Sequence, residues 1–252
     1  MPMGDSGTRN GAVSARADRL LVIVPAWNEE ATLPNTLREL RAAVSEADLL
    51  VVDDGSTDRT AHVAKLEGAI VLTLPYNLGV GGAMRAGFKY ARRRGYSRAI
   101  QVDADGQHDP KDIGAVLAGL GRADISIGAR FADRGSYTVR GPRKWAMWFL
   151  AAVVSKLAGE KLTDVTSGFR AANARAINQY CEHYPAEYLG DTIDSLVFAV
   201  RSGLSVTQVA VEMRQRQGGS PSNNPFRAAL YLVRAVFALF ISVTRRKGTL
   251  AR

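Results

Sequence analysis

Five short apolar runs alternate with segments of helical period between residues 20 and 128, and this alternation limits the fold more than any other feature of the chain. The runs are LLVIV, LLVV, AIVLTL, RAIQV and DISIG, which begin at residues 20, 49, 69, 98 and 124. Short apolar runs of this kind are typical of strands that a sheet buries on both faces. They predict an α/β fold: a mostly parallel, Rossmann-like sheet flanked by helices, with ligands at the carboxyl ends of its strands.

Length and composition set the context for this sheet. The chain has 252 residues, of which 46% are hydrophobic, and can bury one large core. Cys181 is its single cysteine, so no disulfide forms within the chain, and a reducing, cytoplasmic setting fits best.

The formal net charge is +9, and no acidic residue follows Glu212. The basic tail faces either solvent or an anionic partner, for which a phosphate substrate, anionic lipid and nucleic acid are the candidates.

Carboxylates follow two of the predicted strands. Asp53 and Asp54 end the second strand, where either a turn or a contact with a base or ribose explains them. Asp103 and Asp105 follow the fourth, and their i, i+2 spacing places both side chains on one side of an extended segment. Such oxygen ligands suit Mg²⁺ or Mn²⁺, and Gln107 continues the alternation with a carbonyl oxygen. An exposed Asp-Gly turn is the better explanation of the second pair unless other features indicate phosphate.

A glycine-rich stretch, YNLGVGGAMRAG at residues 76–87, provides such a feature, because its backbone amides can meet phosphate at the start of a helix. The same glycines partly match the dinucleotide fingerprint of nicotinamide-dependent enzymes. Met84 at its sixth position, and its place after the third strand rather than the first, count against that alternative.

Polar residues predict two helix starts. Ser56, Thr57 and Asp58 are good capping residues for a helix after the second strand. After the fourth strand, Asp109 is predicted to cap a helix whose first turn contains Pro110.

Several stretches, taken together and in order, resemble the family 2 glycosyltransferases, in particular polyprenyl-phosphate sugar synthases of the dolichyl-phosphate mannose synthase type. They are VIVPAWNEE, VVDDGSTDRT, NLGVGGAMRAGF, QVDADGQHDP, GARF, TDVTSGFRA and VEMRQRQGG, within residues 20–219. Two departures are Trp27, where tyrosine is more usual, and Val165, where many relatives carry proline.

The resemblance implies a GT-A fold, a nucleotide-sugar donor and Mg²⁺ or Mn²⁺ as cofactor. The nucleotide-binding residues that it implies are Pro25, Ala26, Asn28, Glu30, Asp53, Asp103, Ala104 and Asp105. The implied metal ligands are Asp103, Asp105 and Gln107, and the implied catalytic residues are Asp105, Arg130, Arg143 and Arg216. Arg214, beside Arg216, is a further candidate for contact with phosphate, since a guanidinium matches phosphate bidentately.

The activity expected from this resemblance is metal-dependent, inverting transfer from a GDP- or UDP-sugar to a polyprenyl phosphate, for cell-envelope glycan or glycoconjugate synthesis. A phosphate monoester has a second pKa of about 6 and needs no general base. Transfer to a saccharide hydroxyl is the alternative; it needs a base, for which Asp191 and Asp194 are the candidates.

A basic nucleic-acid-binding module explains the charge but not the acidic strand ends, and we expect no nucleic-acid partner.

Two segments combine cations with aliphatic and aromatic side chains: residues 143–157 and 229–247. The apolar part of the second is shorter than the ~20 residues of a membrane span, and Arg234 interrupts it. We expect either an interfacial helix on anionic lipid or an ordinary amphipathic helix packed on the domain or on another subunit of a homo-oligomer. The first alternative places the protein in the cytoplasm, peripheral on the inner face of the cell membrane.

The expected organisation has four parts. Residues 1–19 form a disordered lead-in, residues 20–128 a nucleotide-sugar-binding half, residues 129–226 an acceptor-binding half of helices and loops, and residues 227–252 an amphipathic C-terminal helix with a basic tail.

Overall fold

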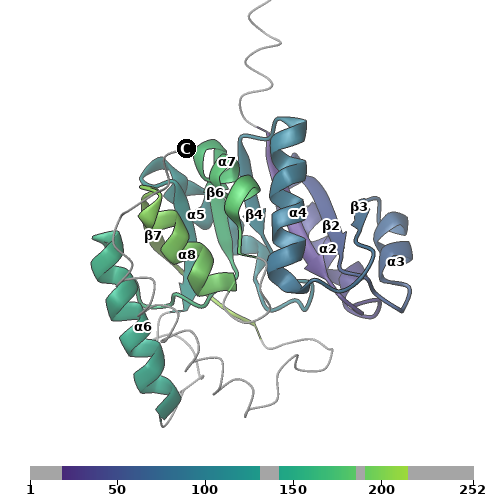
Figure 1. The fold of residues 1–252 in the computed structure, drawn as a ribbon. Helices are drawn as coiled ribbons and strands as arrows, with labels where there is room; N and C mark the ends of the chain where they lie inside the picture. Colours follow the sequence, from purple (N-terminus) through teal and green to yellow (C-terminus); the bar gives the residue numbers. More distant parts are fainter. Residues whose placement is uncertain (1–18, 131–141, 186–190, 215–252) are drawn as a thin grey trace, which may run out of the picture.

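The computed structural model describes residues 19–130, 142–185 and 191–214 (Figure 1), and of residues 130, 142–148 and 191 it describes the backbone alone. The predicted C-terminal helix and nearly all of the predicted lead-in lie outside these residues. The described strands are β1 (Leu20–Ala26), β2 (Asp48–Asp53), β3 (Ile70–Thr73), β4 (Arg98–Gln101), β5 (Ile125–Arg130), β6 (Arg170–Asn173) and β7 (Val206–Val211). The described α-helices are α2 (Leu33–Ala43), α3 (Thr60–Leu66), α4 (Gly79–Arg94), α5 (Ile113–Ala118), α6 (Pro142–Ala158), α7 (Ala174–His183) and α8 (Asp191–Arg201).

These strands form one sheet in the order β3-β2-β1-β4-β6-β5-β7. The five predicted strands are confirmed as β1 to β5, and β1 pairs in parallel with both β2 and β4. β6 is antiparallel to its neighbours β4 and β5, while β7 is parallel to β5. The predicted α/β class with a mostly parallel sheet is therefore confirmed.

The prediction that only helices and loops follow Gly128 is wrong, because β6 and β7 belong to the same sheet. β6 has the sequence RAAN, and three of its four residues are Arg and Ala, so it contains no apolar run to indicate a strand. Among the described strands, β7 lies at the end of the sheet and pairs with β5 alone, and it mixes polar with apolar residues. Neither has the apolar pattern of a strand buried within a parallel sheet.

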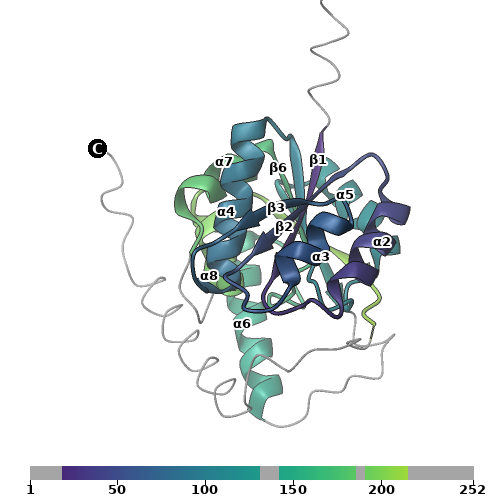
Figure 2. The ribbon, with the colours of Figure 1, turned by 90° about the vertical axis from the view of Figure 1, so that its right-hand side faces the viewer.

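Helices cover both faces of the sheet, with α4, α7 and α8 on one side and α2, α3 and α5 on the other (Figure 2). The alternation of side chains along β1 shows the two layers: Leu21 and Ile23 join one core cluster, and Val22 and Val24 join the other. Gly87 lets α4 approach the sheet closely, since a Cβ there would lie 2.6 Å from Cγ2 of Ile23. Both faces are thus buried, as the apolar runs required.

Arg19, which we assigned to the lead-in, is part of the folded domain. Its carbonyl oxygen accepts hydrogen bonds from the backbone amides of Ser97 (3.1 Å) and Arg98 (3.2 Å). Its guanidinium donates to Asp48 (2.9 Å) and lies 4.2 Å from the ring centroid of Tyr96. These contacts stabilise the end of the sheet opposite the strand carboxyl ends, so the folded domain includes at least one residue before the apolar run.

α6 is a helix of 17 residues that packs against α8. Leu150 and Val154 are buried on its inner side, whereas Phe149 and Leu157 are exposed. Across the described residues, the structure contains no helix with the length and apolar character needed to cross a membrane.

Candidate active site

The loop after β1 is bound to the loop after β2. Asn28 has a positive φ of 55°, its backbone amide donates to Oγ of Ser56 (3.0 Å), and its Oδ1 accepts from the amide of Thr57 (2.9 Å). The backbone amide of Glu30 donates to Oδ2 of Asp58 (3.1 Å). Two predicted nucleotide-binding residues, Asn28 and Glu30, therefore lie in one rigid pair of loops.

The predicted helix start at Ser56–Asp58 is wrong, because α3 begins only at Thr60. The Asp58 carboxylate accepts from the Thr60 backbone amide (2.9 Å) and from Glu30 of the other loop. The polar side chains that suggested a cap are instead used to join two loops. By contrast, Asp109 caps the turn that contains Pro110, as predicted, and accepts from the amide of Lys111 (3.0 Å).

Pro25, Ala26 and Asp53 lie at the carboxyl ends of β1 and β2, all buried. Asp53 is 2% exposed, and its Oδ1 accepts from the backbone amide of Ser56 (3.1 Å). Gly55 closes this turn with a φ of +70°, and a Cβ there would lie 2.6 Å from the carbonyl carbon of Tyr76. The predicted turn therefore explains the hydrogen bond to one carboxylate oxygen of Asp53. A contact between Asp53 and a base or ribose stays a prediction.

The Asp54 carboxylate accepts hydrogen bonds from a different loop than the neighbouring Asp53 carboxylate does. Its two carboxylate oxygens accept from the backbone amides of Leu78 and Gly79, both at 2.8 Å, at the start of α4. Burial raises the pKa of the Asp54 carboxyl above its usual value, and the two amide hydrogen bonds only partly offset that rise. The glycine-rich stretch therefore binds a carboxylate of the chain itself, so these two amides do not serve the phosphate-binding role that we considered for them.

Asp54→Asn is expected to lower the free energy of unfolding by about 1–3 kcal/mol, because the amide side chain has one acceptor oxygen for two partly buried N–H groups. Urea denaturation of the purified proteins measures this loss. Glu46→Gln, a neutralisation at an exposed position, is the control and should match the wild type. Equal stability of Asp54→Asn and the wild type would contradict this account of α4.

The second acidic motif forms a turn rather than an extended segment. β4 ends at Gln101, and the chain turns at Gly106 with a φ of +73°. Asp105 is 9% exposed, and its Oδ1 accepts from the backbone amide of Gln107 (3.0 Å). The carbonyl oxygen of Ala104 accepts from Oγ1 of Thr36 on α2 (3.0 Å). The argument from strand alternation was wrong here, because the pairing with β1 ends at Val102 and the chain turns at Ala104 and Asp105.

Asp103 is held by neighbours that the sequence did not identify. Its Oδ1 accepts from Nε2 of Gln101 (3.0 Å), and its backbone amide donates to Nδ1 of His108 (3.0 Å). The buried His108 ring stacks on Phe169 with centroids 4.8 Å apart. A Cβ on Gly168 would lie 2.9 Å from Nε2 of Gln101 and 3.3 Å from Oδ2 of Asp103. Residues 166–170, the TSGFR segment, thus pack directly on the turn that contains Asp103 and Asp105, here called the acidic turn. Only the occurrence of TSGFR among the stretches that resemble family 2 glycosyltransferases could have indicated this contact.

The remaining predicted residues divide into two groups. Arg130 ends β5, which is parallel to β4, so its backbone lies at the same edge of the sheet as the acidic turn. Arg143 and Asp191 lie in the first turns of α6 and α8, Asp194 follows on α8, and Arg216 is outside the described residues. The roles of these five residues stay predictions.

Arg214 is placed clearly, and its partners are carboxylates. Its Nε and Nη2 donate to the two carboxylate oxygens of Asp109 (3.0 and 2.8 Å), and its Nη1 donates to Glu39 on α2. All three guanidinium nitrogens of Arg214 therefore have carboxylate partners within the protein.

A divalent cation fits the acidic turn by its chemistry. Within the described part of the chain, no group of three or more His, Cys, Asp or Glu side chains is placed to hold a metal. Mg²⁺ and Mn²⁺ sites in nucleotide-using enzymes commonly take one or two carboxylates and complete their coordination with water and phosphate oxygens. Asp103 and Asp105 in one fixed turn provide such a set, and Gln107 adds an amide oxygen.

Comparison with known proteins decides the family. Residues 21–181 match the family model described as glycosyl transferase family 2. The chain belongs to glycosyltransferase family 2. This family 2 glycosyltransferase is 36% identical over 211 residues to the undecaprenyl-phosphate mannosyltransferase of Micrococcus luteus, covering 80% of this chain and 86% of the relative. It is 31% identical over 227 residues to the polyprenol monophosphomannose synthase of Mycolicibacterium smegmatis, covering 85% of each.

Solved structures agree on the fold. The glucosyl-3-phosphoglycerate synthase of Mycobacterium tuberculosis, solved with Mn²⁺, UDP-glucose and phosphoglyceric acid, superposes with a TM-score of 0.68. The two proteins are 22% identical, and the match covers 95% of this chain and 85% of that one. The predicted GT-A fold is confirmed, and so is the enzyme class that the resemblance implied, a glycosyltransferase.

Proposed function

We propose that this glycosyltransferase moves a hexose, mannose in the first instance, from a nucleotide sugar to a polyprenyl phosphate with inversion at the anomeric carbon. The acidic turn at Asp103 and Asp105, fixed at the carboxyl edge of the sheet, is the observation that carries the proposal. Two relatives matched over most of their length are named as a mannosyltransferase and a mannose synthase with polyprenyl-phosphate acceptors. GDP-mannose is therefore the first donor to test, and UDP-sugars follow.

In this mechanism, Asp103 and Asp105 hold Mg²⁺ or Mn²⁺ with the donor diphosphate, and Gln107 is the third proposed ligand. The metal, when bound, acts as a Lewis acid that stabilises charge on the departing nucleoside diphosphate. Hydrogen bonds from Gln101 and Gln107 orient the two carboxylates, and Nδ1 of His108 accepts from the backbone amide of Asp103. Preorganised groups of this kind stabilise developing charge without reorganising during the reaction.

The donor and phosphate contacts are assigned as the resemblance implied. Pro25, Ala26, Asn28, Glu30 and Asp53 would line the nucleotide pocket, together with Asp103, Ala104 and Asp105. Arg130, Arg143 and Arg216 would bind phosphate oxygens of donor and acceptor, for which a planar guanidinium is well suited. A polyprenyl phosphate is mostly doubly ionised at neutral pH, so no proton must be removed during attack.

Transfer to a saccharide hydroxyl is the second candidate, and one observation favours it. Nη1 of Arg170 donates to the carbonyl oxygen of Thr192 (2.7 Å), which joins the start of α8 to the TSGFR segment beside Asp103. Asp191 and Asp194 thus belong to a helix fixed near the acidic turn, where a general base would be needed. Loss of chemistry in both Asp191→Asn and Asp194→Asn, with folding intact, would favour this candidate.

The proposed place of action is the cytoplasmic face of a membrane, where a polyprenyl acceptor is found. Exposed Phe149 and Leu157 on α6 support this, because apolar side chains on an outer helix can enter a lipid interface. The basic residues of the chain suit anionic lipid, whose attraction adds about 1 kcal/mol for each Lys or Arg near the surface.

A transfer assay tests the proposal. Purified protein is incubated with Mn²⁺ or Mg²⁺, a short polyprenyl phosphate, and labelled GDP-mannose, UDP-glucose or UDP-N-acetylglucosamine in turn. We expect label to enter the organic phase with one donor and to be lost when EDTA removes the metal. Nucleotide binding with metal but without lipid product from any donor would instead indicate a hydroxyl acceptor.

A further inference from the structure

The end of β7 is joined to the acidic turn through main-chain contacts. Met213 forms an isolated antiparallel bridge with His108, and the backbone amide of Arg214 donates to the carbonyl oxygen of Gln107 (2.9 Å). The amide of Gln107 in turn donates to Oδ1 of Asp105 (3.0 Å). Arg214 therefore fixes the peptide unit next to the one that orients a proposed metal ligand.

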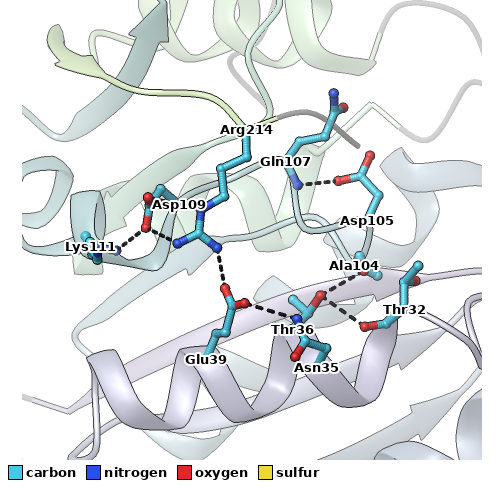
Figure 3. Close-up of polar contacts among 10 residues, drawn as sticks. All are labelled: Thr32, Asn35, Thr36, Glu39, Ala104, Asp105, Gln107, Asp109, Lys111 and Arg214. Atoms are coloured by element: carbon cyan, nitrogen blue, oxygen red, sulfur yellow. Dashed lines mark hydrogen bonds and ion pairs between the residues drawn. The ribbon is translucent and has the colours of Figure 1, made fainter. Parts of the chain in front are cut away.

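The guanidinium of Arg214 adds a second link, shown in Figure 3. It lies between Asp109, to which it donates two hydrogen bonds, and Glu39 on α2, to which Nη1 donates one. The other oxygen of Glu39 accepts from Nδ2 of Asn35 (3.0 Å), which holds the carboxylate in place. The side chains are partly buried, with 30% of Arg214 and 16% of Asp109 exposed. Partial burial strengthens such an ion pair relative to a fully solvated one.

α2 also contacts the acidic turn directly, so the contacts close into a ring. Thr36 lies one helical turn before Glu39, and its Oγ1 donates to the carbonyl oxygen of Ala104 (3.0 Å). The ring runs from Thr36 to Ala104, along the turn to Gln107 and Arg214, and back to α2 at Glu39. Figure 3 shows its two contacts with α2, at Thr36 and at Glu39. Opening this ring at Arg214 leaves the turn attached to α2 on one side only.

We propose that Arg214 is a positioning residue: it holds the turn of residues 103–109 in the geometry that binds the metal, and it does not itself bind the diphosphate. This inference rests on the proposed metal-binding role of Asp103 and Asp105. Groups that orient metal ligands typically change metal affinity or activity by about 10- to 100-fold when they are removed.

Calorimetric titration with Mn²⁺ and with GDP or UDP tests the inference without any acceptor. Arg214→Met is expected to weaken Mn²⁺-dependent nucleotide binding about tenfold, and Glu39→Gln to weaken it in the same direction by less. The double variant is expected to bind no more weakly than Arg214→Met alone, because both changes open the same ring. Arg122→Met, which removes an exposed arginine, is the matched control and should bind as the wild type does.

A direct phosphate contact gives the opposite pattern. If Arg214 bound the diphosphate, Glu39→Gln would release the guanidinium and keep or strengthen binding, and Arg214→Lys would keep most of the affinity. If Arg214 positions the turn, Arg214→Lys lacks the planar guanidinium that donates to two carboxylates at once. This variant is then expected to bind the nucleotide nearly as weakly as Arg214→Met. Wild-type binding by Glu39→Gln together with near-wild-type binding by Arg214→Lys would overturn the inference.

Failure of the proposed function is distinguishable from failure of this inference. Wild-type protein that binds neither GDP nor UDP in the presence of Mn²⁺ overturns both. Wild-type protein that binds, with Arg214→Met and Glu39→Gln binding equally well, overturns the positioning role alone. Thermal unfolding of every variant identifies any that fail to fold, and Glu39→Gln, a partly exposed neutralisation, serves if Arg214→Met is one of them.

Discussion

Asp105→Asn is expected to reduce sugar transfer at least about a hundredfold without unfolding the protein. The asparagine keeps an oxygen that accepts from the amide of Gln107, so the turn can keep its shape. It removes the negative charge that a divalent cation requires. Lewis-acid stabilisation by a metal is worth several kcal/mol, and each 1.4 kcal/mol lost slows the reaction about tenfold. Asp103→Asn is expected to act in the same direction.

The measurement is the initial rate of lipid-linked product at several Mn²⁺ concentrations, with Glu46→Gln as the control for loss of one carboxylate at an exposed position. A far-ultraviolet spectrum and a melting curve establish that each variant is folded. Transfer by folded Asp105→Asn at more than a tenth of the wild-type rate would remove the acidic turn from the mechanism.

Arg170→Met is expected to lower the free energy of unfolding by about 3–5 kcal/mol, the largest stability effect that we predict. Arg170 is 8% exposed and lies at the start of β6. Its guanidinium donates to the carbonyl oxygens of Ser167, Val165 and Thr192, each at 2.7 Å. Each buried carbonyl that loses its partner costs about 1–3 kcal/mol, and three of them lose it together.

Urea denaturation measures this loss, with Arg122→Met as the control for removal of an exposed arginine. Arg170→Lys should lie between the wild type and Arg170→Met, because it keeps the charge but cannot donate to three separated carbonyls at once. A loss below about 1 kcal/mol for Arg170→Met would mean that water replaces the guanidinium and that these carbonyls are not buried in solution.

Local features of the sequence predicted the larger part of the fold. β1 to β5 are found where apolar runs required buried strands, and Asp109 caps its turn as its position before Pro110 indicated. These predictions succeeded because the determining interactions lie within a few residues of each other. The Asp-Gly turn at Asp105 and Gly106 was likewise one of the two interpretations that the local residues allowed, and the metal site there stays a prediction.

Predictions that depended on distant partners were less successful. Asp54 was considered beside a base or ribose and Arg214 beside phosphate, yet Asp54 binds amides 24 and 25 residues away, and Arg214 binds carboxylates 105 and 175 residues away. Their charges suggested an anionic or cationic partner, but no pattern in the sequence says which residue the fold brings near. β6 was missed for a related reason, since its position depends on pairing with β4 and β5 rather than on its own composition.

The position of β6 has a consequence for how the chain matures on the ribosome. β3, β2, β1 and β4 come from residues 20–101 and can pair as soon as that length has been made, but the free side of β4 pairs only with β6. Until residues 170–173 emerge, the nascent protein exposes an open strand edge directly beside the future metal site. Open edges of this kind promote association between chains. Translation pauses between residues 101 and 170 should therefore favour misassembly, and chaperones that shield strand edges should matter most during that interval.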